Sequence, residues 1–361
     1  MARFRATSRR MLAVAVVGLG SVCASEAGQP APPKGTLERV TIHGRALEGN
    51  LEGDSPDRPV AVYLPPSYAT ETSRRYPVLY FLHGYGATAD VYVRALGIPE
   101  SIDRAIAAGT REMIVVLPDA FTKYSGSMYS SSPTIGDWET FVARDLPAAI
   151  DAKYRTLATR EARGLAGHSM GGYGTMRVGM KQPGAFGALY AMSSCCLMND
   201  PAGRGVAPGR GDAAGRGTAP APAGRGAPPP PGRGGGLANA LSAQAAAWAP
   251  NVHNPPDYFD LPTKDGEIQP PIAAQWVANS PLVMIGQYAP ALRSMRAVAL
   301  DVGDRDPFVA TNRQLADALT RVDVAQTLEV YEGDHMNHIR DRFEMKVLPF
   351  FSRQLGATAG K

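Results

Sequence analysis

The stretch GLAGHSMGGYG, residues 164–174, places a serine between two glycines. Ser169 fits the pattern G-x-S-x-G, in which the glycines let neighbouring backbone come close and leave the hydroxyl exposed on a sharp turn. Because the chain contains 39 glycines, the pattern alone is weak evidence for a nucleophile. Its context is stronger, since an apolar run at 162–167 precedes it and a helical pattern at 175–183 follows. The sequence therefore predicts a nucleophilic serine on a strand-to-helix turn.

A nucleophilic serine needs a carboxylate that orients its base and stabilises the base when it is charged. The segment DVGDRDP, which ends an apolar run, offers Asp301, Asp304 and Asp306. Asp301 still belongs to the predicted strand and Asp304 to the turn after it, so we favour Asp306, with the other two as alternatives. Turn formation is the competing role for all three, because aspartate favours turns.

The base should be a histidine in a loop after a later strand. In EGDHMNH, His335 directly follows a strand-end turn and is favoured, whereas His338 should already be entering the last helix. His43 and His253 are expected to be ordinary surface or loop residues. His168, next to the nucleophile, is expected to pack or to donate a hydrogen bond.

The oxyanion that develops on a substrate carbonyl needs two backbone N–H donors. The residue after the nucleophile, Met170, supplies the first. For the second, the segment LHGYG at 82–86 follows a predicted strand, and we favour the amide of Tyr85, with that of Gly86 as the alternative.

The elements that must position these residues alternate between strands and helices. Two extended runs at 37–47 and 58–66 predict an antiparallel pair at the start of the domain. Helical periodicity follows at, for example, 139–154 and 309–322. Short apolar runs typical of buried strands recur at 76–84, 112–120, 162–167, 186–193, 296–303 and 327–333. The fold class is therefore α/β, with a mostly parallel central sheet and helices on both faces.

The N-terminus predicts a secretory signal peptide over residues 1–24, because arginines precede an apolar run and small residues that permit cleavage. The run is short for a helix that spans a bilayer, so an uncleaved membrane anchor is the less favoured alternative. Ser8-Arg9-Arg10 is compatible with twin-arginine export. We expect a secreted or periplasmic protein with no stable membrane insertion after cleavage. The arginines of this segment account for the net charge of +4, so the charge does not indicate a nucleic-acid partner.

Residues 201–237 repeat GRG among proline and alanine, which predicts a disordered insertion that proteases can cut. Arginine-rich arms that bind nucleic acid interleave aromatic residues, and this segment has none. After it, residues 237–288 are expected to form a helical cap whose aromatic side chains belong mainly to the core. Cys195 and Cys196 predict no disulfide framework, and no clustering of ligand residues indicates a metal or an organic cofactor.

Several segments together resemble the esterase D and antigen 85 branch of the α/β-hydrolases, which includes feruloyl and acetylxylan esterases, S-formylglutathione hydrolase and mycolyltransferases. The matching segments are LHGYG at 82–86, SMYSSSPTIGDWETFVARDLPAAIDAKYR at 127–155, GHSMGGYG at 167–174, DVGDRD at 301–306 and YEGDHMNHIRDRF at 331–343. The resemblance implies an esterase domain over residues 35–356. It assigns Ser169, Asp306 and His335 as nucleophile, acid and base, and Tyr85 and Met170 as oxyanion donors.

The resemblance further implies that Trp138 and Tyr129 lie along the substrate cleft, although Trp138 could equally be a packing residue at a helix start. The implied reaction is cofactor-free hydrolysis of a small-molecule or polysaccharide-linked ester through an acyl-enzyme. The alternatives are acyl transfer to an alcohol, as in the antigen 85 proteins, and a non-catalytic secreted binding protein.

Overall fold

The computed structural model describes residues 1–2, 34–199 and 236–356. Nearly all of the expected signal peptide at 1–24 lies outside the described residues. The expected insertion at 201–237 also lies outside them, except for its last two residues, which begin helix α6 at Gly236. The description below concerns residues 34–199 and 236–356.

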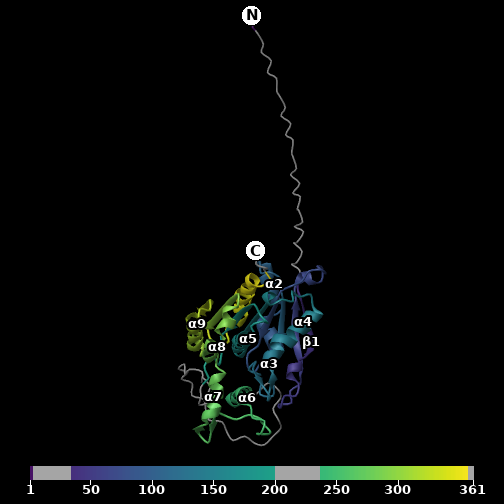
Figure 1. Cartoon of the computed structure of the whole chain (residues 1–361). Helices are drawn as coiled ribbons and strands as arrows, with labels where there is room; N and C mark the ends of the chain where they lie inside the picture. Colours follow the sequence, from purple (N-terminus) through teal and green to yellow (C-terminus); the bar gives the residue numbers. More distant parts are fainter. Residues whose placement is uncertain (3–33, 200–235, 357–361) are drawn as a thin grey trace, which may run out of the picture. The chain divides into compact units, whose positions relative to one another are not determined.

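A central sheet of eight strands organises the domain (Figure 1). In spatial order its strands are β1 (Thr36–His43), β2 (Asp57–Leu64), β4 (Ile114–Pro118), β3 (Val78–Leu82), β7 (Arg163–His168), β8 (Ala188–Met192), β11 (Ala297–Gly303) and β12 (Gln326–Tyr331). The pairs β1–β2 and β2–β4 are antiparallel, and all other neighbours are parallel. The predicted α/β class, the opening antiparallel pair and the six later strands are confirmed.

Both faces of the sheet are buried, because side chains alternate between two cores. Along β3, Val78, Tyr80 and Leu82 enter one core, while Leu79 and Phe81 enter the other. The first core is covered by α3 (Trp138–Thr140), a π-helical turn (Phe141–Asp145), α4 (Leu146–Lys153), α5 (Met170–Lys181), α8 (Pro281–Arg293) and α9 (Val309–Arg321). The second is covered by α1 (Ala89–Leu96), α2 (Glu100–Ala107), α10 (Ile339–Arg342), a π-helical turn (Phe343–Val347) and α11 (Leu348–Gln354).

Two further helices, α6 (Gly236–Trp248) and α7 (Pro270–Ala278), lie where a helical cap was expected, at the end of the domain shown lowest in Figure 1. Neither helix contains a charged residue. Trp248 and Trp276 pack edge to face between them, with ring centroids 5.3 Å apart. Two short strand pairs complete the structure: β5 (Ser131–Ser132) with β6 (Gly136–Asp137), and β9 (Thr263–Lys264) with β10 (Glu267–Ile268). Within the described ranges, no helix has the length and apolar character needed to cross a membrane.

Helix α5 begins at Met170, directly after Ser169, rather than at the expected 175. Its first turns are rich in glycine, which costs about 1 kcal/mol per residue in a helix relative to alanine. Tertiary packing decides the outcome here, because a Cβ on Gly174 would lie 2.5 Å from the ring of Tyr129. The glycines let this helix lie close against its neighbours and start immediately at the turn.

Candidate active site

Ser169 occupies a strained turn between β7 and α5, with φ of 58° and ψ of −115°. The flanking glycines make this turn sterically possible. A Cβ on Gly167 would lie 2.4 Å from the backbone of Gly171, and a Cβ on Gly171 would lie 2.0 Å from the carbonyl oxygen of Leu82. Such strain at a non-glycine residue is typical of nucleophile turns, which project the hydroxyl beyond the end of the sheet.

Ser169, His335 and Asp306 form a continuous hydrogen-bonded chain. The Ser169 Oγ lies 2.9 Å from His335 Nε2, and His335 Nδ1 lies 2.9 Å from Asp306 Oδ2. His335 follows β12 and Asp306 follows β11, so the crossover between these parallel strands brings both to the carboxyl edge of the sheet. Asp306 Oδ1 also accepts the N–H of Phe308 at 2.8 Å. Burial acts to raise the pKa of Asp306, but hydrogen bonds from His335 and Phe308 outweigh it and lower that pKa.

The alternative acids and base have other partners. Asp301 accepts hydrogen bonds from Arg342 and Tyr190, both at 2.9 Å. Asp304 accepts a backbone N–H at 2.9 Å and so stabilises the turn. His338 pairs with a carboxylate three residues later at the start of α10. None of these three belongs to the chain of hydrogen bonds that ends at Ser169.

His168 packs against His335 and hydrogen-bonds to its backbone. Its Nδ1 accepts the Tyr92 hydroxyl at 2.7 Å, and its Nε2–H donates to the carbonyl of His335 at 2.9 Å. Burial, together with the nearby imidazole of His335, lowers the pKa of His168 to about 3. His168 is therefore neutral near pH 7, and it donates a hydrogen bond as its position in the sequence suggested.

The first expected oxyanion donor, Met170, is the first residue of α5. Its N–H has no acceptor one turn earlier in the same helix, and it lies at the positive end of the helix dipole. For the second donor, the structure separates the two candidates. The N–H of Gly86 donates to the carbonyl of Ser125 at 2.9 Å, which leaves the amide of Tyr85 as the candidate.

The orientation of the Tyr85 amide follows from the residue before it. The Nδ1–H of His83 donates to the Gly84 carbonyl at 2.9 Å, while Nε2 of the same ring accepts the N–H of Ala120 at 2.8 Å. Because a trans peptide is planar, fixing the Gly84 carbonyl directs the Tyr85 N–H to the opposite side. A Cβ on Gly84 would lie 3.4 Å from that of Ser169, so this peptide runs beside the nucleophile. Burial lowers the pKa of His83, which favours the neutral ring that both contacts require.

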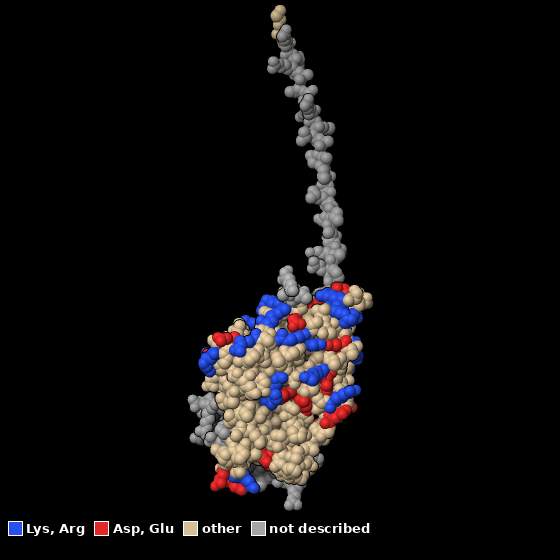
Figure 2. Space-filling model, in the orientation of Figure 1, with Lys and Arg blue, Asp and Glu red and all other residues tan. Residues whose placement is uncertain are grey.

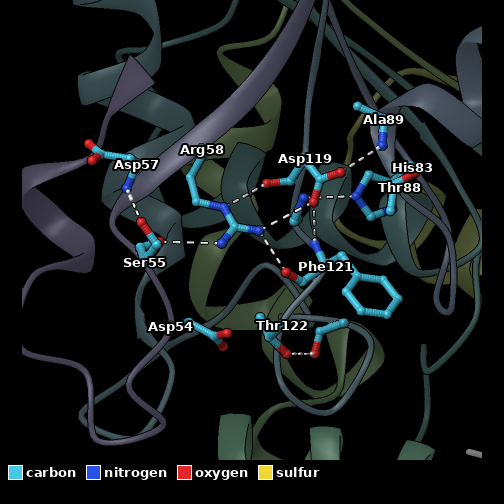
Figure 3. Close-up of polar contacts among 12 residues, drawn as sticks. Asp54, Ser55, Asp57, Arg58, His83, Thr88, Ala89, Asp119, Phe121 and Thr122 are labelled. Carbon is cyan, nitrogen blue, oxygen red and sulfur yellow. Dashed lines mark hydrogen bonds and ion pairs between the residues drawn. The ribbon is translucent and has the colours of Figure 1, made fainter. Parts of the chain in front are cut away.

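A buried ion pair anchors the same loop (Figure 3). Arg58 on β2 contacts Asp119 through the backbone carbonyl at 3.1 Å and the carboxylate at 3.2 Å, and it donates to the carbonyl of Phe121 at 2.6 Å. The other carboxylate oxygen of Asp119 accepts the N–H of Ala89, the first residue of α1, at 3.1 Å. Figure 3 shows Asp119 between Arg58 and Ala89, with the ring of His83 alongside. A buried pair of this kind is tolerated because further hydrogen bonds satisfy both charges.

The expectation that Tyr129 and Trp138 contact substrate is corrected, because both are fully buried and neither lines the cavity at Ser169. For Trp138 the alternative of a packing residue at a helix start is the one observed. The Tyr129 hydroxyl donates to the carbonyl of His83 at 3.1 Å. The Trp138 indole N–H donates to Ile135 at 2.9 Å, and its ring lies 5.1 Å from the guanidinium of Arg58. Tyr129 therefore contacts the loop that carries Tyr85 directly, and Trp138 contacts it through Arg58. Large aromatic rings favour such core positions.

A cavity of about 450 Å³ opens at Ser169 and His335. Its aromatic walls are Tyr85, Tyr92, Trp276 and Phe308. Sequence reasoning missed Tyr92 and Phe308 and the two cysteines that line the cavity, and it placed the cap aromatics, Trp276 among them, mainly in the core. No Lys, Arg, Asp or Glu occurs among the described residues that line this cavity. The walls come from α1, α6, α7 and the loops after several strands, so no local pattern could have grouped them. Among the described residues, no group of three or more His, Cys, Asp or Glu side chains is placed to hold a metal ion.

Comparisons with known proteins identify the family. The model of the Esterase family matches residues 55–344. An esterase of Mycobacterium tuberculosis is 37% identical over 136 residues, which are 37% of this chain and 28% of the relative. The S-formylglutathione hydrolase of Rattus norvegicus is 26% identical over 155 residues, 38% of this chain and 51% of the relative. The chain thus spans about half or less of the curated relatives that it matches.

Solved structures show the same fold. A ferulic acid esterase superposes with a TM-score of 0.63 at 22% identity, covering 90% of this chain and 100% of the other. MPT51 of Mycobacterium tuberculosis superposes with a TM-score of 0.56 at 15% identity, covering 89% and 99%. The expected α/β-hydrolase fold is confirmed, and the chain belongs to the Esterase family.

Proposed function

We propose that this protein is a serine carboxylic-ester hydrolase that works through an acyl-enzyme on Ser169. The observation that carries the proposal is the chain of hydrogen bonds from Ser169 through His335 to Asp306, with both distances at 2.9 Å. Family membership supports the same reaction. The structural relatives titled ferulic acid esterase support it at the level of the fold.

The geometry defines the role of each group. His335 Nε2 accepts the Ser169 proton while the oxygen attacks the ester carbonyl, and Asp306 stabilises the imidazolium that forms. The amides of Met170 and Tyr85 bind the developing oxyanion. His335 then donates its proton to the departing alcohol. Water, deprotonated by the same imidazole, attacks the acyl-enzyme and releases the acid.

The cavity favours uncharged esters. Its walls combine apolar and aromatic side chains with a few neutral polar ones, and none of its described lining residues is charged. A carboxylate buried there would lack a partner and would cost several kcal/mol. On the face that Figure 2 shows, the surface over α6 and α7 has few charges, whereas acidic and basic side chains are interspersed elsewhere. Neutral esters, small or attached to a polysaccharide, fit this arrangement.

The test is hydrolysis by the full chain of p-nitrophenyl esters that differ in acyl length and charge. A neutral butyrate and the matched succinate half-ester test the charge preference. We expect Ser169→Ala to lower kcat at least about 10⁴-fold, and a fluorophosphonate to add once to the wild type and not to this variant. Ser194→Ala is the matched control, because its buried hydroxyl has no hydrogen-bond partner within the described part of the chain.

An inert wild type that does not react with the fluorophosphonate would contradict the proposal and favour a non-catalytic binding protein. Activity that survives Ser169→Ala would mean another nucleophile. Adding an alcohol to the same assay measures transfer against hydrolysis, since both reactions share the acyl-enzyme. Export directed by residues 1–24 is a further part of the proposal, and it is tested by locating the mature protein and its N-terminal residue after expression.

A further inference from the structure

Two adjacent cysteines line the cavity that opens at Ser169. Cys195 and Cys196 follow β8, and both are free thiols. Their sulfur atoms lie 2.7 Å apart, about 0.7 Å more than a disulfide bond requires. The mechanism proposed above uses neither thiol, so this pair is a reactive group that the site does not otherwise explain.

The pair contacts the nucleophile through the backbone. The N–H of Cys195 donates to the carbonyl of Ser169 at 3.3 Å. Cys196 has a φ of 58°, a conformation that is uncommon for residues with a Cβ, and its sulfur accepts the side-chain amide of Gln244 on α6 at 3.6 Å. A rearrangement of the two cysteines would therefore affect both the backbone of Ser169 and helix α6 of the cap.

Adjacent cysteines form a disulfide of a distinctive kind. Neighbouring Cα atoms are about 3.8 Å apart across a trans peptide, which is less than the 4.4–6.8 Å usual in disulfides. The ring is therefore strained, and strained disulfides are reduced more easily than structural ones. Such a bond suits reversible regulation better than permanent stabilisation.

We propose that Cys195 and Cys196 form a redox-sensitive dithiol that closes to a reversible disulfide and slows the reaction of Ser169 with esters. The effect on ester turnover rests on the proposed function, whereas formation of the bond does not. The oxidant is a small uncharged dialkyl disulfide such as bis(2-hydroxyethyl) disulfide, whose neutrality suits a cavity with no charged residue among its described lining.

The exchange balances in two steps. The Cys196 thiolate attacks one sulfur of the small disulfide, and the first small thiol leaves. Cys195 then loses its proton and attacks the Cys196 sulfur of the mixed disulfide, and the second thiol leaves. The protein loses two protons and two electrons, and the small disulfide takes them up to become two thiols.

The two thiols differ in environment in the way these steps require. The hydrogen bond with Cys196, together with burial, raises the pKa of the Cys195 thiol well above its usual value. Cys195 is only 6% exposed, whereas Cys196 is more accessible. Cys196 is therefore the sulfur that attacks first, and Cys195 the one that closes the ring. Closure encloses the Cys195–Cys196 peptide in a ring, and the Cys195 N–H that contacts the Ser169 carbonyl lies directly before that ring. The new bond also changes the cavity wall beside the nucleophile.

The test uses the full chain with Cys23→Ser, which leaves only this pair of thiols. The protein is treated with bis(2-hydroxyethyl) disulfide, which is uncharged, and then with dithiothreitol. We expect a loss of about 2 Da that dithiothreitol reverses, located by digestion to the peptide that contains both cysteines. We expect kcat/KM for p-nitrophenyl butyrate, and the rate of fluorophosphonate labelling of Ser169, to fall at least about threefold in the oxidised form.

Cys195→Ser and Cys196→Ser serve as controls, each compared with itself before and after treatment. Cys195→Ser should keep a mercaptoethanol adduct on Cys196, because no second thiol displaces it, and Cys196→Ser should react little. A wild-type pair that stays reduced overturns the proposal, and so does a disulfide that leaves both rates unchanged. A reduced protein that neither hydrolyses esters nor reacts with the fluorophosphonate would contradict the proposed function, while the mass measurement would still report on the bond.

Discussion

At the scale of single residues, the partner of each carboxylate decides which one can serve the base. The three aspartates near the end of β11 lie within six residues of one another, yet only Asp306 contacts His335. Asp301 is held by Arg342, and Asp304 stabilises a turn. Asp301 lies within β11 and is fully buried, whereas Asp306 lies beyond the last residue of the strand, so five positions along the chain separate a buried structural acid from the candidate acid.

Asp306→Asn should lower kcat roughly 10⁴-fold while leaving the fold intact. If the new amide oxygen keeps its contact with the Phe308 N–H, its NH₂ group faces His335 Nδ1 and favours the wrong tautomer of the imidazole. Initial rates with a p-nitrophenyl ester, together with thermal unfolding, measure both effects. Asp304→Asn is the matched control, since asparagine can still accept the backbone N–H at that turn. Equal losses in the two variants would show that Asp306 is not the acid.

At the scale of elements, the loop between β3 and α1 depends on side chains from several strands. His83 fixes the Gly84 carbonyl, Asp119 after β4 holds the start of α1, and Arg58 from β2 holds Asp119. Tyr129 adds a further contact by donating to the carbonyl of His83. The loop that carries Tyr85 is thus positioned by a network whose side chains do not line the cavity at Ser169.

His83→Ala should lower kcat about 10- to 100-fold with little change in KM, because a misplaced Tyr85 N–H binds the transition state poorly and the ground state almost as before. His83→Asn is the informative partner, since its amide NH₂ can replace Nδ1–H as donor to Gly84 while losing the acceptor for Ala120. We expect it to recover most of kcat. If both variants lose kcat equally, or if only KM changes, His83 does not position the oxyanion donor.

At the scale of the whole molecule, the stability of the fold at low pH depends on His168, a buried neutral histidine next to Ser169. His168 joins β7, α1 and the loop after β12 through its two hydrogen bonds. In the unfolded chain its pKa returns to 6.5, whereas burial lowers the folded value to about 3. Between these values the unfolded state binds the extra proton, so the contribution of His168 to stability is lost as the pH falls.

The free energy of unfolding should therefore contain a His168 contribution that decreases by up to about 3 kcal/mol between pH 7 and pH 4. Asp301 acts in the opposite direction, because burial raises its folded pKa to about 6 and it favours the folded state at low pH. Denaturant unfolding of the wild type and of His168→Gln across this range isolates the histidine. The difference in unfolding free energy between the wild type and the variant should decrease as the pH falls. A difference that stays constant would show that His168 has the same pKa in the folded and the unfolded chain.

The amino-acid sequence by itself determined where the strands lie along the chain, the glycines of the nucleophile turn and a short set of candidate residues. These depend on local patterns: apolar runs of strand length, periodicity, and a turn that only glycine permits. Hydrogen-bond partners depend on how distant segments cross. Tertiary structure alone therefore separated Asp306 from its neighbours and Tyr85 from Gly86. The tertiary structure also buries Trp138 and Tyr129 in the core rather than in the expected cleft, and it places Cys195 and Cys196 beside Ser169. Sequence patterns do not decide these positions, because which face of an element is buried depends on what packs against it.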